Sequence, residues 1–167
     1  MTAPNQPPLH PDLELLAGLL GSWSGRGEGH YPTIESFSYD ETITFGHVGK
    51  PFLAYSQRTR STGESPLPLH AETGYWRAPT PGRVELVLAH PTGVTEIEEG
   101  TVDVVDGVLV IDLATMSVGL SSSAKRVDAL ARRFEVRGDT MTYDVSMAAV
   151  GEPLTHHLRA TLHRVPG

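Results

Sequence analysis

The amino-acid sequence predicts an all-β protein: an antiparallel up-and-down β-barrel of about ten strands, preceded by one short helix. Apolar and polar side chains alternate over most of the 167 residues, as they do in strands that bury one face. The 17 glycines and 13 prolines fall mostly between these runs, where tight turns are expected. Tight turns join antiparallel neighbours, and closure into a barrel removes the exposed edges of such a meander.

The N-terminal region predicts a disordered tail and then the helix. Residues 1–11 are rich in proline, whereas residues 12–167 predict a single domain. Within Asp12–Leu20 leucines recur at helical spacing. Asp12 is the predicted N-cap, and Gly21 is the residue predicted to end the helix.

The rest of the chain predicts short strands joined by turns. Alternation is clearest over Phe37–Phe45, and Asp106-Gly107 is the strongest hairpin signal because both residues tolerate positive φ. A two-sheet sandwich is the alternative, but one helix before a long meander favours a barrel plugged at one end. A barrel of more than about eight strands has interior space for a ligand. Strands are predicted at residues 22–30, 37–45, 52–61, 70–77, 83–90, 94–101, 101–105, 108–114, 126–137, 140–150 and 154–165.

Composition and charge exclude several classes of function. A formal net charge of −7 disfavours nucleic acid as a partner. The absence of cysteine excludes disulfides, thiolate metal sites and a cysteine nucleophile. No apolar run approaches the length of about 18 residues that indicates a membrane-spanning helix, and no basic segment introduces a secretory signal. We therefore expect a cytoplasmic protein that binds neither nucleic acid nor membranes.

Common catalytic motifs are missing from the sequence. It has no phosphate-binding Gly-x-x-x-x-Gly-Lys loop, no dinucleotide-binding glycine fingerprint and no Gly-x-Ser-x-Gly nucleophile elbow. Glu96 and Glu98 could be paired carboxylates, because they share one face of a predicted strand. A solvated outer face is the simpler interpretation, and we expect both side chains to be exposed.

The eight histidines are the remaining candidates for chemistry. His156 and His157 are adjacent in a strand and point to opposite faces, so they cannot chelate one metal together. A zinc site would need distant partners such as His70 and His90. A single histidine facing the cavity could instead be a core residue, or the lone axial ligand of a haem.

Strand parity does not decide which histidine of the adjacent pair faces inward. One face carries His156 with Leu158, Ala160 and Leu162, and the other carries His157 with Thr155, Arg159 and Thr161. In a ligand-filled barrel the apolar face could also point outward, against the helix. Both assignments stay open on this pattern.

A Gly-x-Trp-x-Gly-x-Gly motif spans Gly21, Trp23, Gly25 and Gly27 at the start of the first predicted strand. A Gly-x-Trp after a short helix is loosely shared by lipocalin-like and fatty-acid-binding-like barrels. Trp23 is expected to close the barrel end with a large apolar body, and the glycines are expected to let backbones approach.

A more specific series of segments follows in order along the chain: Tyr31–Ile34, His47–Phe52, His70–Trp76, Thr92–Val94, Ser123–Lys125, Met147–Ala148 and His157–Ala160. Through these segments the chain from Leu13 to Val165 resembles the nitrobindin family. Members of this family are haem-binding β-barrels assigned as peroxynitrite isomerases, and the resemblance implies a ten-stranded antiparallel barrel that holds one haem b per chain.

The resemblance also assigns residues. The histidine before the final Leu-x-Ala strand is the axial iron ligand of the family, which is His157 here, and His156 becomes an outward flanking residue. The threonine of Tyr-Pro-Thr is a haem contact, which is Thr33, and Lys125 could reach a haem propionate or remain solvated. The positions that line the haem cavity in the family are Leu69, His70, His90 and Met147, and His90 departs from relatives that have a glutamine there.

The resemblance implies a ferric haem protein with one axial histidine and an open or water-occupied sixth position, which converts peroxynitrite to nitrate and also binds nitric oxide. Such chemistry needs no protein nucleophile or general base, in agreement with the missing motifs. The alternative is a barrel that carries a fatty acid or another apolar molecule without catalysis, which would not need the imidazole of His157. The sequence leaves the oligomeric state open, a homodimer included.

Overall fold

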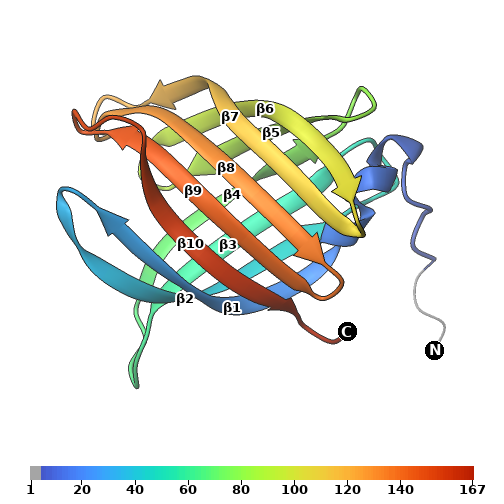
Figure 1. The fold of residues 1–167 in the computed structure, drawn as a ribbon, viewed down its shortest axis with the longest axis horizontal. Coiled ribbons are helices and arrows are strands. Elements are labelled where there is room, and N and C mark those ends of the chain that lie inside the picture. The colour runs from blue at the N-terminus through green and yellow to red at the C-terminus, as the bar shows by residue number, and fades with distance from the viewer. Residues whose placement is uncertain (1–4) are drawn as a thin grey trace.

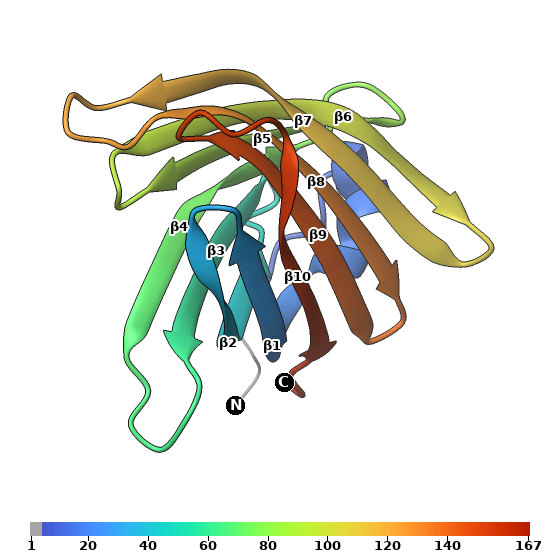
Figure 2. The same ribbon diagram turned by 60° about the vertical axis from the view of Figure 1, so that its left-hand side comes forward.

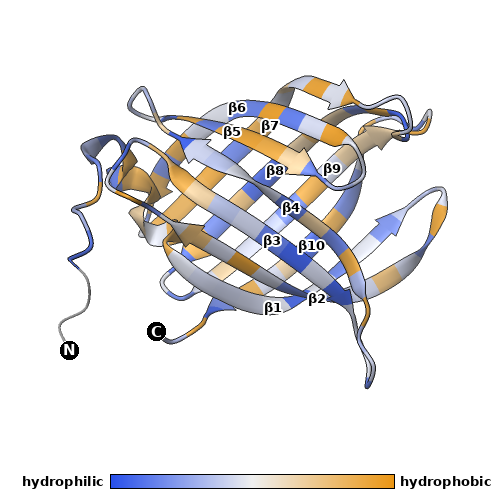
Figure 3. Cartoon of the chain, turned by 180° about the vertical axis from the view of Figure 1, so that it is seen from behind, coloured by the Kyte–Doolittle hydropathy of each residue, from blue (hydrophilic) through white to orange (hydrophobic). Residues whose placement is uncertain are grey.

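Ten antiparallel strands close into one barrel in the computed structural model, which describes residues 5–167 (Figure 1). Each strand pairs with its neighbours in sequence, and β1 pairs with β10 to close the barrel, so the predicted up-and-down barrel is confirmed. Orange and blue residues alternate along the wall in Figure 3, as expected for strands with one buried face. The strands are β1 Gly21–Tyr31, β2 Ile34–Gly46, β3 Leu53–Ser61, β4 Pro68–Arg77, β5 Arg83–His90, β6 Val94–Val105, β7 Val108–Leu120, β8 Val127–Arg137, β9 Thr140–Ala149 and β10 Thr155–Arg164.

The prediction of two strands at 94–101 and 101–105 is wrong, because β6 runs without a break. Gly100, beside the predicted division, lies within the strand and packs closely on β7: a Cβ there would lie 1.7 Å from the carbonyl oxygen of Asp112. β2 and β7 are also longer than predicted. The first residues of β2 and the last of β7 have little buried surface, so they show no clean alternation.

The predicted helix is a 3-10 helix, η1 (Pro11–Leu19), and its N-cap is His10 rather than Asp12. The Asp12 backbone N–H donates to His10 Nδ1 at 3.2 Å, which leaves Asp12 inside the first turn. Leu13, Leu16 and Leu19 are fully buried, and their spacing of three residues matches the period of a 3-10 helix.

The helix lies at one end of the barrel, and the β1–β2 hairpin projects at the other (Figure 1 and Figure 2). Part of the predicted disordered tail, residues 1–4, lies outside the described residues. Further along the tail, Gln6 Nε2 is 3.2 Å from His47 Nε2. Among residues 5–167, no helix combines the length and the apolar character needed to cross a bilayer.

Trp23 packs at the helix end of the barrel, as the motif predicts. Its side chain is fully buried, its Nε1–H donates to the Leu19 carbonyl at 2.8 Å, and the Arg164 guanidinium lies 4.2 Å from the ring centroid. The glycines permit close approach, because a Cβ on Gly25 would lie 2.1 Å from the Thr161 carbonyl oxygen. Strand β1 therefore contacts the helix through Trp23 and closes the barrel by pairing with β10.

Trp23→Phe is expected to lower the free energy of unfolding by about 1–3 kcal/mol, because the buried Leu19 carbonyl loses its donor. Denaturant unfolding measures the loss. Trp76→Phe is the matched control: Trp76 is equally buried, but its Nε1 has no hydrogen-bond partner within residues 5–167, so less is lost. An equal loss in both variants would contradict this role of the indole N–H.

Candidate functional site

A cavity of about 700 Å³ occupies the end of the barrel away from η1. This volume is within the range of about 300–1,000 Å³ that is usual for small-molecule and cofactor sites. One side of the cavity is largely apolar and the other is polar. The apolar part includes Ile34, Phe37, Leu69, Val127, Leu130, Val145, Met147 and Leu158, and the polar part includes Glu41, Gln57, His70, Glu72, His90, Glu96 and Arg132.

A β-bulge decides which histidine of β10 faces the cavity. The register of β10 on β9 shifts by one residue between His156 and Leu158, so His157 is the extra residue. His157 and Leu158 consequently both line the cavity. His156 points outward, with Nε2 2.8 Å from Asp144 Oδ1 and Nδ1 2.9 Å from His30 Nε2. Strict alternation could not reveal this arrangement.

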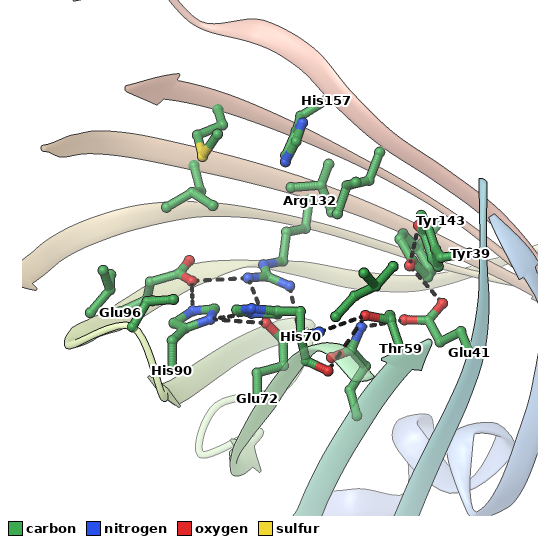
Figure 4. Close-up of a pocket in the computed structure, with 18 of the residues that line it drawn as sticks. Tyr39, Glu41, Thr59, His70, Glu72, His90, Glu96, Arg132, Tyr143 and His157 are labelled. Atoms are coloured by element: carbon green, nitrogen blue, oxygen red, sulfur yellow. Dashed lines mark hydrogen bonds and ion pairs between the residues drawn. The ribbon is translucent and has the colours of Figure 1, made fainter. Parts of the chain in front are cut away.

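His157 presents a metal-binding nitrogen to the cavity. Its Nδ1 lies 3.0 Å from the backbone carbonyl oxygen of His30, and because a carbonyl only accepts, Nδ1 carries the proton. The lone pair is therefore on Nε2, the nitrogen that projects into the cavity in Figure 4. Burial lowers the pKa of His157, which favours this neutral form. A neutral imidazole fixed through Nδ1 is the usual arrangement of a histidine that binds a metal through Nε2.

The structure brings most of the other predicted site residues to the same cavity. Its lining includes Leu69, His70, His90, Lys125 and Met147. Thr33 is the exception. It lies exposed in the turn between β1 and β2, next to Ile34, which does line the cavity.

The prediction that Glu96 and Glu98 are solvated is wrong. The two side chains are 1% and 0% exposed and point into the barrel, whereas Ile97 between them is 44% exposed. Arg132 of β8 explains why these two carboxyl groups can be buried, because it provides a positive charge beside both. Its Nη2 donates to Glu96 at 2.9 Å, and its Nε lies 2.7 Å from Glu98 Oε2 without the alignment of a hydrogen bond.

Glu72 of β4 completes the group around Arg132. Arg132 donates to Glu72 Oε1 at 3.0 Å and to Oε2 at 3.3 Å, and the Tyr55 hydroxyl donates to Oε1 at 2.7 Å. We call Arg132, Glu72, Glu96 and Glu98 the Arg132 cluster. Its side chains are all at least nine-tenths buried, so charge neutralisation inside the cluster governs its stability.

Burial and Arg132 divide the carboxyl groups of the cluster into two kinds. Burial alone would raise the pKa of Glu72 and Glu96. Arg132, together with His90 and the hydrogen bonds that these carboxylates accept, outweighs burial, lowering the pKa of Glu72 and bringing that of Glu96 to about 2. For Glu98, burial and the neighbouring Glu96 outweigh Arg132, and the pKa is raised to about 8. Glu72 and Glu96 are therefore anionic at neutral pH, and Glu98 is mostly protonated.

A second polar group surrounds Glu41 of β2. The Tyr143 hydroxyl donates to Glu41 Oε1 at 2.6 Å, and Gln57 Nε2 donates to Oε2 at 2.6 Å. The hydroxyl groups of Tyr39 and Tyr143 are 2.8 Å apart. Burial is the main cause that raises the pKa of Glu41 to about 7. These hydrogen bonds pair most polar atoms of this group, whereas Gln57 Oε1 is buried without a partner among residues 5–167.

Glu98 is expected to contribute stability that is lost as the pH rises from about 5 to 8. A carboxyl group whose pKa is higher in the folded state binds more protons there, so its contribution is lost between the unfolded and the folded pKa. For Glu98 this window runs from 4.5 to about 8. Glu98→Gln, which cannot ionise, should flatten the loss when the melting temperature is measured from pH 5 to pH 8. An equally steep loss in this variant would contradict the raised pKa.

His70 and His90 form a hydrogen-bonded chain on the cavity wall opposite His157 (Figure 4). His90 Nε2 makes a short contact with Glu96 Oε2, and because this carboxylate is an acceptor, Nε2 carries the proton. His90 Nδ1 then accepts from His70 Nε2–H across 2.9 Å. Carboxylate and imidazole groups thus extend from the Arg132 cluster to the open cavity.

Sequence reasoning missed Glu41, Glu72 and Arg132, although a signal for each exists. Each occupies a position in its strand that alternates with outward residues and shares the buried face. Glu41 shares that face with Ile43, and Arg132 shares it with Phe134. A charged residue in phase with apolar neighbours indicates a buried, paired charge.

The chain is similar to known proteins over almost its whole length. Residues 12–164 match the family model described as "THAP4-like, heme-binding beta-barrel domain". The chain is 60% identical over 156 residues to "Peroxynitrite isomerase 1" of Mycolicibacterium paratuberculosis, covering 93% of this chain and 96% of that protein. It is 61% identical to "Peroxynitrite isomerase" of Nocardia farcinica, covering 93% and 92%. The crystal structure of Rv2717c from M. tuberculosis superposes with a TM-score of 0.93 at 52% identity, covering 95% of this chain and all of that one.

Proposed function

This chain belongs to the family of THAP4-like haem-binding β-barrel domains, and we propose that it is a haem b protein whose ferric form isomerises peroxynitrite to nitrate. The single observation that carries the proposal is His157, a neutral histidine whose free Nε2 projects into the cavity. The names of the relatives that match almost the whole chain support peroxynitrite as the substrate.

The residues present fit a haem. Haem needs one imidazole and an apolar slot, and His157 lies beside Leu130, Val145 and Met147 in the cavity lining. Lys125 also lines the cavity and would bind a propionate, while Leu69 would contact the macrocycle. Thr33 is exposed in the turn next to the cavity, and we retain it as a proposed haem contact.

The protein groups would bind, shield and orient rather than react. When bound, ferric haem supplies an iron that acts as a Lewis acid toward the peroxynitrite anion. His157 would hold that iron through Nε2, with the His30 carbonyl fixing the ring. The apolar wall would exclude water, and His70 and His90 would set the polarity of the opposite side.

Three smaller proposals accompany this function. A haem held by one histidine leaves a position at which nitric oxide would also bind. We further propose a cytoplasmic location, and we keep the homodimer as a prediction for solution measurements. The rival function, a fatty-acid carrier, leaves the orientation of His157 unexplained.

The function is tested with the chain loaded with haemin. A Soret band at one haem per chain is expected, and the ferric protein should accelerate peroxynitrite decay in stopped flow with a raised nitrate yield. The haem-free chain is the control. A chain that binds haemin but leaves the decay rate and nitrate yield unchanged would contradict the isomerase proposal, and a colourless chain that takes up no haemin would favour the carrier.

His70→Ala and His90→Ala are expected to slow peroxynitrite decay only modestly while haem stays bound. Each histidine can contribute at most one hydrogen bond to the bound anion, worth about 1.5–3 kcal/mol. This corresponds to roughly a tenfold to hundredfold change in rate. Stopped flow of the haem-loaded variants in buffer with a chelator measures it. Complete loss of isomerisation in either variant would reveal an acid–base group that the proposal omits.

A further inference from the structure

We propose that His70, Glu72 and His90 form a binding site for one divalent first-row transition-metal ion, on the cavity wall opposite His157. The inference is independent of the proposed function, because none of its ligands is the proposed haem ligand. The three residues come from two adjacent strands: β4 supplies His70 and Glu72, and β5 supplies His90.

The donor atoms already converge. His70 Nε2 is 2.9 Å from His90 Nδ1, and His90 Nδ1 is 3.6 Å from Glu72 Oε2. One ligand atom of each residue lies within 4.8 Å of the other two. At metal–ligand distances of about 2.1 Å, separations of 2.9 and 3.6 Å correspond to angles of about 90° and 120° at the metal. Both are ordinary coordination angles, so an ion would need only a small movement of His70.

Neighbouring groups hold two of these ligands in position. His90 is bonded through Nε2 to Glu96, which leaves Nδ1 for the ion, as in carboxylate–histidine–metal arrangements. Tyr55 and Arg132 occupy Glu72 Oε1, and Arg132 takes one lone pair of Oε2. The second lone pair of Oε2 remains for the ion.

The charge of the wall also favours a divalent cation. In the Arg132 cluster the two anionic carboxylates, Glu72 and Glu96, share a single guanidinium, so the cluster keeps a formal charge of −1. Buried negative charge without a counter-charge is strongly unfavourable, and a divalent cation at Glu72 would neutralise it. His70 is only partly buried and lines the open cavity, which gives the ion a path from solvent.

The ligand set indicates the class of metal. Two imidazoles and one carboxylate bind Zn²⁺ and Fe²⁺, whereas Ca²⁺ and Mg²⁺ prefer sites made of oxygen ligands. The sequence contains no cysteine, so a thiolate site cannot compete for these ions. Zn²⁺ is a suitable probe because it has no redox chemistry.

The test measures zinc per chain, by equilibrium dialysis followed by mass spectrometry of the metal. The wild-type full chain and His157→Ala should each bind one Zn²⁺, since His157 is not a ligand. His70→Ala and His90→Ala should lose this zinc while their circular dichroism stays unchanged. His70 lines the open cavity, so its variant is the safer one for folding. Glu96→Gln should weaken binding by about 10–100-fold through the orientation of His90.

The matched control is His156→Ala. It removes an outward imidazole that contacts His30 and Asp144, a second place where histidine and carboxylate side chains meet. We expect this variant to keep one Zn²⁺ per chain. The proposal is overturned if the wild-type chain binds no zinc, if His70→Ala retains it, or if His156→Ala abolishes it. Because no haem is needed, these outcomes are separate from a failure of the isomerase proposal.

Discussion

His157→Ala is expected to abolish haem binding and with it the isomerisation of peroxynitrite, whereas His156→Ala should retain both. The two residues are adjacent in β10, but the bulge turns only His157 into the cavity. His156 is held outside by Asp144 and His30. The variant pair therefore compares inward and outward imidazoles in the same strand.

Haemin titration followed by the Soret absorbance measures the first effect, and stopped flow measures the second. His157→Ala should show no five-coordinate histidine spectrum and no acceleration above free haemin. If His156→Ala loses the haem and His157→Ala keeps it, the assignment is shifted by one residue and is wrong.

Arg132→Met is expected to lower the free energy of unfolding by about 3–5 kcal/mol at neutral pH, because it leaves buried carboxylates without a counter-charge. Burial raises the pKa values of Glu72 and Glu96, and Arg132 makes the largest of the contributions that lower them. Without Arg132 the pKa values of Glu72 and Glu96 would be higher. As the pH falls, these carboxyl groups would become protonated, and the free-energy cost of burying their charge would decrease. The loss of stability should thus be larger at pH 8 than at pH 5.

Arg133→Met is the matched control for this measurement. Arg133 is the next residue, but it is about half exposed and pairs with Asp112 on the outer surface at 2.8 Å. Exposed ion pairs contribute about 0–1 kcal/mol, so denaturant unfolding should show little change. Equal losses in the two variants would contradict the role of the Arg132 cluster in stability.

Much of the fold could be predicted because its determinants are local. Alternation located the strands, Asp106-Gly107 adopts the expected positive φ values in a turn, and the tight connections imply the antiparallel order. Errors arose where local patterns have a second explanation. Residues 94–105 form one strand although two were predicted, and His10 caps the helix although Asp12 is the commoner capping type.

The polar half of the cavity was harder to predict because its partners are distant in sequence. Glu72 and Arg132 are 60 residues apart, and Glu96 and Arg132 are 36 apart. Glu96 and Glu98 seemed to belong to a solvated face because a strand pattern cannot show a buried counter-charge. The orientation of His157 depends on a bulge, which alternation excludes by assumption. The family resemblance supplied that residue where parity could not.

A crystal structure of the chain loaded with haemin would show which residue binds the iron. We expect the iron to be bonded to His157 Nε2, with His157 Nδ1 still donating to the His30 carbonyl and the haem face turned toward His70 and His90. Iron bonded to His70, His90 or His156, or a haem bound outside the barrel cavity, would contradict it.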